Sequence, residues 1–242
     1  MPIKINTFND PSASGGDTYA YGINDTDQIV GYYQDTSGSA PTDYHGFLLS
    51  GGTYTAIDLP GATPGTTFAF GINDLGQVVG SYSIFGNYPN RTSHGFLYSG
   101  GVYITLDDPL AGSGGTGAVA INASGQIVGT YGDANGIRHG LLYSGGTYTT
   151  IDVPFGANGT FAYGINDLGQ IVGYYTNASG EHGFLYSGGT YTTLDYPGAN
   201  STSPWGSSPS AIAYWPRTPS YGASSPSKPP TPASSPMRTI RA

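Results

Sequence analysis

The chain has 242 residues, with 40 glycines, 21 tyrosines and no cysteine, and only 9% of its residues are charged. Without cysteine it can form neither disulfides nor thiolate metal sites, and it has no cysteine nucleophile. Its net charge is −8 and all 15 acidic residues precede position 200, so the main part of the chain repels phosphate backbones and nucleic acid is not an expected partner.

The first segment, residues 1–11, contains Thr-Phe-Asn-Asp-Pro, which matches Thr-Leu-Asp-Asp-Pro at 105–109. In the later copy this pattern closes a repeat, so we expect 1–11 to form a strand that belongs to the last repeat and closes a ring. The segment has no apolar region typical of a signal peptide. No apolar run reaches the ~18 residues that a membrane span needs, so no membrane span is predicted.

Four copies of one pattern follow the opening segment. They cover residues 18–65, 67–115, 116–159 and 160–199. In the last copy the segments 161–166, 170–175, 182–187 and 190–195 each read as a short strand bounded by turn residues. The first two segments are joined by a hairpin ending in a left-handed glycine, replaced in the first copy by Asp27, a residue type that tolerates this conformation.

Repeats of this length cannot bury their own apolar surface and must stack on one another. The predicted fold is therefore all-β, a β-propeller of four-stranded antiparallel blades within residues 1–199. The opening strand predicts four complete blades and an incomplete fifth. A closed four-bladed propeller is the alternative ring, and a linear solenoid is the competing arrangement.

Residues 200–242 have a different composition, rich in proline and serine. Only Trp205-Gly206 and 211–215 echo the first two strands of a repeat. We interpret this tail as a degenerate fifth blade or a disordered segment, with a natural Pro-rich linker as the alternative.

The recurrent Gly-Ile-Asn-x-x-Gly-Gln-Ile-Val-Gly, the His-Gly-Phe step and the Ser-Gly-Gly-x-Tyr ending resemble the bacterial HAF repeat family. The resemblance spans residues 18–197, with glycine in place of the family's alanine after each histidine and Leu141 in place of the phenylalanine in the third copy. It implies an extracellular or cell-surface location and assigns no activity.

The main length variation lies in the loop between the second and third strands of each repeat. These loops gather on one face of a propeller, where a rigid scaffold presents adaptable side chains. The predicted ligand contacts on this face are Tyr44, Tyr88, Arg91, Arg138 and Glu181.

One histidine begins the third strand of each repeat. These residues are His45, His94, His139 and His182. They lie too far from the axis to share one ion, so we predict a structural role and no metal site. Asp25, Asp74 and Asp167 follow an asparagine in the first turn, where aspartate satisfies the local backbone; they lack the alternating ligand pattern of a calcium loop.

No catalytic motif or cofactor-binding motif is present, and the single glutamate lies in a loop. We therefore predict no cofactor and a non-enzymatic binding module that recognises a glycan or a protein through the variable-loop face. One alternative is a structural envelope or matrix protein that self-associates through the incomplete fifth blade. A glycoside hydrolase or lyase is the other alternative.

Overall fold

The computed structural model describes residues 9–13, 17–35, 43–63, 65–85, 91–155, 158–195, 201–203, 207–208, 211–217 and 238–241. In this part of the chain all regular structure is β-strand, which confirms the all-β prediction. Among the same residues no helix could cross a membrane. The predicted strand around Phe8 and the candidate ligand residue Tyr88 lie outside the described residues.

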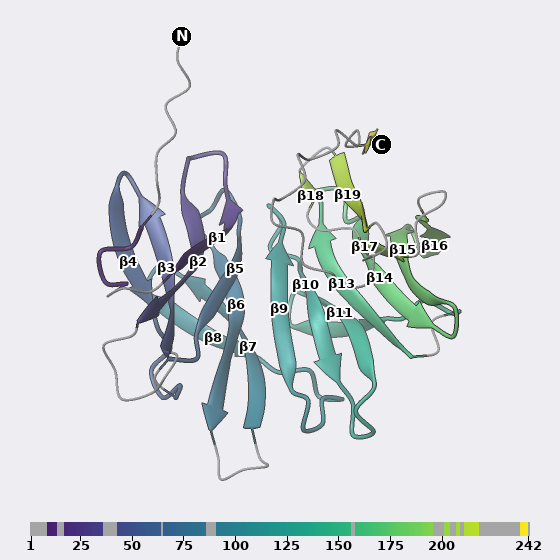
Figure 1. The fold of residues 1–242 in the computed structure, drawn as a ribbon, viewed down its shortest axis with the longest axis horizontal. Coiled ribbons are helices and arrows are strands. Elements are labelled where there is room, and N and C mark those ends of the chain that lie inside the picture. The colour runs from purple at the N-terminus through teal and green to yellow at the C-terminus, as the bar shows by residue number, and fades with distance from the viewer. Residues whose placement is uncertain are drawn as a thin grey trace, which may run out of the picture.

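The four repeats form four antiparallel sheets of four strands, arranged around a common axis (Figure 1). The strands of the first two sheets are β1 (Thr18–Ile23), β2 (Ile29–Asp35), β3 (Asp43–Ser50), β4 (Thr53–Ile57), β5 (Phe68–Ile72), β6 (Val78–Phe85), β7 (Arg91–Ser99) and β8 (Val102–Leu106). Those of the third and fourth are β9 (Thr116–Ile121), β10 (Ile127–Gly132), β11 (Arg138–Ser144), β12 (Thr147–Ile151), β13 (Gly159–Ile165), β14 (Ile171–Asn177), β15 (Gly180–Ser187) and β16 (Thr190–Thr193). The third and fourth sheets are joined by one parallel bridge between Arg138 and Gly159.

The hairpin turns form where the sequence has a residue that can adopt a left-handed backbone. Gly76, Gly125 and Gly169 have φ of 71°, 77° and 73° in the turn between the first two strands, and Asp27 takes the same place with φ 59°, as predicted. A glycine also recurs inside the second strand of each repeat, where close packing rather than a left-handed backbone requires it. A Cβ at Gly173 would overlap the carbonyl oxygen of Phe161 on the neighbouring strand, so the Ile-Val-Gly pattern allows close strand approach.

The core lies between neighbouring sheets. At each junction a valine of one sheet's second strand packs in a cluster with an alanine and an isoleucine of the next sheet's first strand. Val30 does so with Ala69 and Ile72, Val79 with Ala118 and Ile121, and Val128 with Ala162 and Ile165. These interdigitated apolar residues hold the sheets in their radial arrangement.

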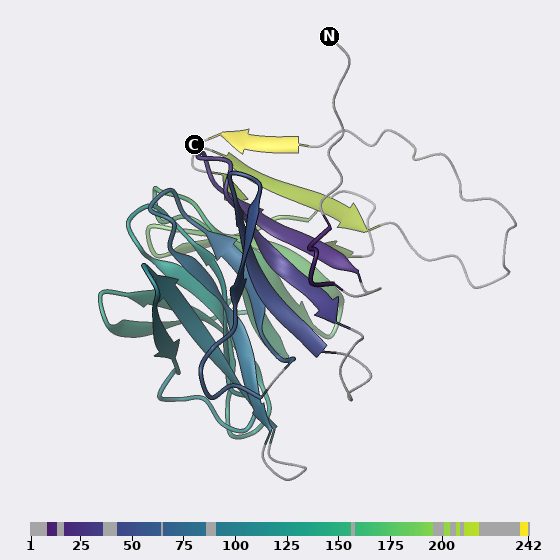
Figure 2. The ribbon, with the colours of Figure 1, turned by 90° about the vertical axis from the view of Figure 1, so that its left-hand side faces the viewer.

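Part of the Pro/Ser-rich tail forms a fifth sheet. Its strands are β17 (Ser201–Ser203), β18 (Ser207–Ser208), β19 (Ala211–Arg217) and β20 (Arg238–Arg241). β19 pairs with the other three strands. β17 contacts β14 and β15, and Thr202 within it is buried. Figure 2 shows β19 and β20 beside the upper edge of the molecule.

Candidate binding pocket on the axis

A pocket of about 630 Å³ lies where the first strands of the four repeats converge. The residues that line it come from β1, β5, β9 and β13 and from the turns that follow these strands. They include Tyr21, Ile23, Asn24, Asp25, Phe70, Ile72, Asn73, Asp74, Val119, Ile121, Asn122, Tyr163, Ile165, Asn166 and Asp167. Because the same positions recur in every repeat, the pocket has near-equivalent walls.

Aromatic rings form three of the four walls. Tyr21, Phe70, Val119 and Tyr163 occupy the same position in successive repeats, so the third repeat alone lacks the ring. The ring of Tyr21 is 5.4 Å from that of Phe70 in an edge arrangement, and Tyr163 stacks on Tyr174 at 5.6 Å. These contacts fix the ring planes, while Tyr21 remains 50% exposed.

Asparagines at the ends of the first strands link neighbouring sheets. The side-chain Nδ2 of Asn24 donates to the carbonyl oxygen of Asn73 at 3.0 Å. Asn73 donates in the same way to Asn122, and Asn122 to Asn166, both at 3.0 Å. Each Nδ2 also donates to a glutamine of its own turn at 2.8 Å. We call this series of bonds the asparagine ladder; it uses both amide hydrogens and leaves these side chains a structural role.

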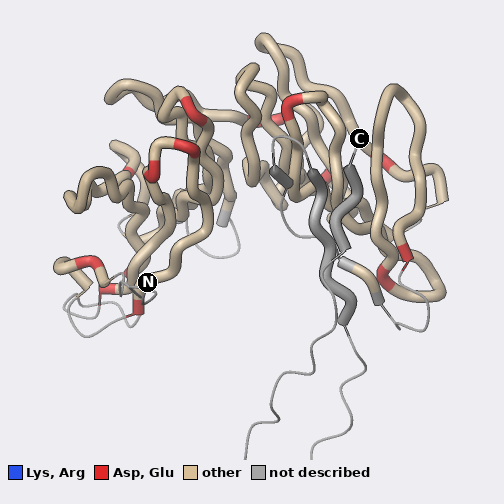
Figure 3. Tube along the Cα trace, turned by 90° about the horizontal axis from the view of Figure 1, so that it is seen from above, with Lys and Arg blue, Asp and Glu red and all other residues tan. Residues whose placement is uncertain are grey.

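Aspartates beside the ladder make a second kind of bond between sheets. The backbone N–H of Asp25 donates to Oδ1 of Asp74 at 2.8 Å, and the N–H of Ala123 donates to Oδ1 of Asp167 at 2.8 Å. The structure thus places the carboxylates of two of the three predicted structural aspartates, Asp74 and Asp167, in bonds between repeats. Their carboxylates also face the pocket and give it a negative edge. In the view of Figure 3 described acidic positions are visible, and no lysine or arginine position is.

The four histidines lie away from the pocket, each in an equivalent environment. Nδ1 of His139 is 2.7 Å from a carboxylate oxygen of Asp152, and the imidazole stacks on Tyr131 at 4.9 Å. The same arrangement holds His45, His94 and His182, with Nδ1-to-carboxylate distances of 2.9 Å to Asp58, Asp107 and Asp195. In every repeat the histidine of the third strand therefore bonds to the aspartate after the fourth strand and stacks on a tyrosine of the second strand. Within the described residues no cluster of ligands could hold a metal ion.

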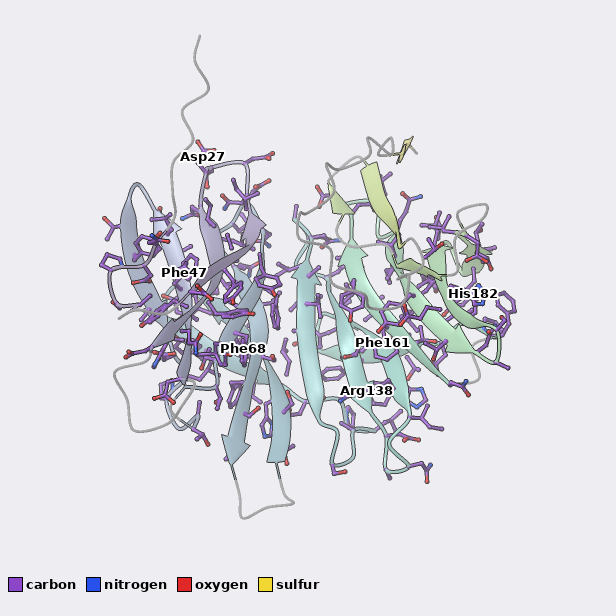
Figure 4. The ribbon with its side chains drawn as sticks, viewed as in Figure 1. Asp27, Phe47, Phe68, Arg138, Phe161 and His182 are labelled. Carbon is purple, nitrogen blue, oxygen red and sulfur yellow. The ribbon has the colours of Figure 1, made fainter. Side chains whose placement is uncertain are left out.

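Among the described residues, the predicted ligand contacts Tyr44, Arg91, Arg138 and Glu181 do not line this pocket. Tyr44 lies in an aromatic cluster at the first junction, 5.3 Å from Phe68 and 5.5 Å from Tyr32. Arg138 donates from Nη1 to the carbonyl of Gly114 at 3.4 Å, and Figure 4 places it at the opposite end from Asp27. Glu181 pairs with Thr176, and Arg91 pairs with Phe85 through its backbone. Their role in binding stays a prediction.

Sequence reasoning did not find the pocket, because it assigned recognition to the variable face. The signal was nonetheless present. An aromatic residue recurs two positions before the isoleucine of the first strand in three of the four repeats, at Tyr21, Phe70 and Tyr163. A ring of repeats necessarily brings such equivalent positions together on its axis.

Comparisons with known proteins define the fold. No protein-family model matches the chain, and no curated protein does. Among solved structures, the β-propeller domain of the Trilobed protease from Pyrococcus furiosus is similar at 13% identity and a TM-score of 0.50, covering 76% of this chain and 53% of that one. A mutant of the Aleuria aurantia lectin in complex with Fucα1-6GlcNAc is also 13% identical, with a TM-score of 0.50, covering 84% of this chain and 71% of that one.

This chain thus spans about half the length of the first of these structures, 53%. At such identities the likeness concerns the fold alone. Together with the radial sheets, it confirms that the chain has a β-propeller fold.

Proposed function

We propose that this protein is a non-enzymatic carbohydrate-binding propeller that holds a sugar in the axial pocket. The observation that carries the proposal is the combination of aromatic walls and a carboxylate edge in one pocket of about 630 Å³. A pyranose ring has apolar C–H faces that stack on Tyr or Phe rings. Its hydroxyl groups can donate hydrogen bonds to carboxylates such as those of Asp25 and Asp167.

A protein of similar fold that binds a sugar supports this proposal. The lectin of similar fold was solved in complex with the fucosylated disaccharide Fucα1-6GlcNAc. The acidic character of the repeats also favours a neutral or cationic ligand over an anionic one, since the chain's net charge is −8. A neutral or amino sugar fits these conditions better than a sulfated or uronic one.

The test begins with a glycan array, followed by calorimetric titration of the best ligand. Tyr21→Ala and Tyr163→Ala each remove one stacking wall, and we expect each to weaken binding about tenfold. Tyr148→Ala, on the outer strand β12, is the matched control and leaves affinity unchanged. Loss of affinity in Arg138→Ala or Glu181→Gln, with the two pocket variants unaffected, would move the site to the variable-loop face.

Glycoside hydrolysis is a second candidate, because Asp25, Asp74 and Asp167 all line the pocket. Hydrolysis needs one carboxyl group as acid and another as base or nucleophile, in different environments. Asp74 and Asp167 instead occupy equivalent environments, each accepting one backbone N–H from the preceding sheet. This equivalence favours binding. Release of reducing sugar from the bound glycan, abolished by Asp74→Asn, would establish hydrolysis instead.

A further inference from the structure

One sheet face differs from its three counterparts in burial but not in sequence. In β5, β9 and β13 the alanine and isoleucine that meet the preceding sheet are at most 8% exposed. In β1 the equivalent Ala20 is exposed, and Ile23 is 64% exposed. We call the surface formed by Ala20 and Ile23 the open face of β1. It has the residues of an inter-sheet junction and no partner within the described part of the chain.

In its described residues the fifth sheet follows the order and register of the first three strands of the other sheets, with β17 and β18 both in the first-strand position. β17 contacts β14 and β15, as β13 contacts β10 and β11 at the previous junction. Ile212 pairs with Ser207 in the second pair after the turn. In the first sheet the second pair after the turn is Val30 with Gly22, so Ile212 corresponds to Val30. Ile240 then pairs with Ile212. In the first sheet Leu48 pairs with Val30 in the same way.

In β19 an aliphatic residue, Ile212, therefore occupies the sequence position that corresponds to Val30, Val79 and Val128. These three valines pack against the next sheet. In a closed ring the sheet that follows the fifth is the first one. β1 and β19 both lie in the upper part of the molecule in Figures 1 and 2. The open face of β1 and the register of β19 are thus compatible with one shared junction.

We propose that the fifth sheet docks on the open face of β1 and closes a five-sheet ring, with Ile212 at the register place opposite Ala20 and Ile23. The occupant is a sheet of the same chain, because the interface continues a packing pattern that the structure shows at three preceding junctions. Closure adds a fifth wall to the axial pocket, which the first four repeats line. The proposal does not depend on the identity of any ligand.

The closing junction differs in its polar bonds from the three junctions between the first four sheets. Residues 24–28, between β1 and β2, begin with the ladder asparagine, and the corresponding turns keep it. Only Pro209 and Ser210 separate β18 from β19, so the sequence there has neither the asparagine nor the aspartate. The asparagine ladder cannot extend to the fifth junction. The proposed junction therefore lacks the ladder bond that the three junctions between the first four sheets have.

Disulfide trapping tests the proposal directly, because the natural chain has no cysteine. The pair Ala20→Cys with Ile212→Cys spans the proposed junction. The pair Ala162→Cys with Val128→Cys spans an equivalent junction that the structure shows and serves as the control. Under mild oxidation at low protein concentration, we expect both pairs to form a disulfide within one molecule. The products are distinguished by mass and by non-reducing electrophoresis.

Two results would overturn the proposal. In the first, the control pair closes while the Ala20–Ile212 pair stays reduced. In the second, the test pair links two molecules, which would assign the open face of β1 to a second copy of the chain. A charged substitution adds an independent measurement. Ile23→Asp should slow trapping of the test pair at least tenfold, whereas Leu75→Asp, at an exposed turn residue outside the open face, should not. Equal trapping rates in the two variants would also contradict closure.

Discussion

β1 and β13 have nearly the same sequence, Thr-Tyr-Ala-Tyr-Gly-Ile and Thr-Phe-Ala-Tyr-Gly-Ile, but different surroundings. Ile165 at the end of β13 is 4% exposed, and Ile23 at the end of β1 is 64% exposed. Local sequence therefore determines that each segment is a strand, whereas the neighbouring sheet determines how much it contributes to stability. In a repeat protein the contribution of a residue depends on its place in the ring as much as on its type.

The largest effect should come from removing side-chain volume at a covered junction. Ile165→Ala leaves a cavity between the third and fourth sheets, and we expect a loss of about 2–5 kcal/mol of unfolding free energy. Ile23→Ala should cost an intermediate ~1–2 kcal/mol if the fifth sheet covers β1 through apolar contacts alone. Urea unfolding of both variants measures the comparison. A cost near zero for Ile23→Ala would contradict closure of the ring.

A smaller difference in unfolding free energy should separate the alanine variants of two asparagines, Asn122 and Asn166. Asn122→Ala removes a buried amide that bonds both its own turn and Asn166, at an expected cost of about 1–3 kcal/mol. Asn166 bonds its own turn but, within the described residues, makes no ladder bond to the fifth sheet. We expect Asn166→Ala to cost clearly less, as measured by thermal unfolding. Equal costs would show that the inter-sheet bond contributes little.

The pocket offers a gain-of-function comparison between the third repeat and the others. Val119→Tyr would restore the aromatic ring that the other three repeats have at this position. If the pocket binds sugar, the added stacking surface should tighten binding about three- to tenfold in calorimetric titration. Val102→Tyr on the outer strand β8 is the control, and it should leave binding unchanged. An equal gain in both variants would point to nonspecific contact.

The smallest effect concerns alkaline pH. Burial raises the pKa of Tyr148 and of Tyr191 to about 12, above the ordinary value of 10.0. Between these values the unfolded chain has lost these protons while the folded chain retains them, so stability falls as the pH rises from 10 toward 12. Tyr148→Phe with Tyr191→Phe should flatten this part of the curve of unfolding midpoint against pH. An unchanged slope would show that other tyrosines cause it.

The repeat pattern was sufficient to predict the all-β fold, the strands of each repeat and the left-handed turn at Asp27. These features depend on local backbone preferences and on the repeat length, which the sequence shows directly. The pocket was missed because it arises only when equivalent positions such as Tyr21 and Tyr163 meet on an axis. The open face of β1 could not be predicted either, since Ile23 and Ile165 have the same local sequence.

Every bond of the asparagine ladder runs in the same direction, from one repeat to the one that follows it. Each unit thus has a donor on one side and an acceptor on the other. A duplicated unit inserted between two existing ones would find both complements in place, without any compensating substitution. The ladder thus permits an additional repeat among the first four, where its bonds are present.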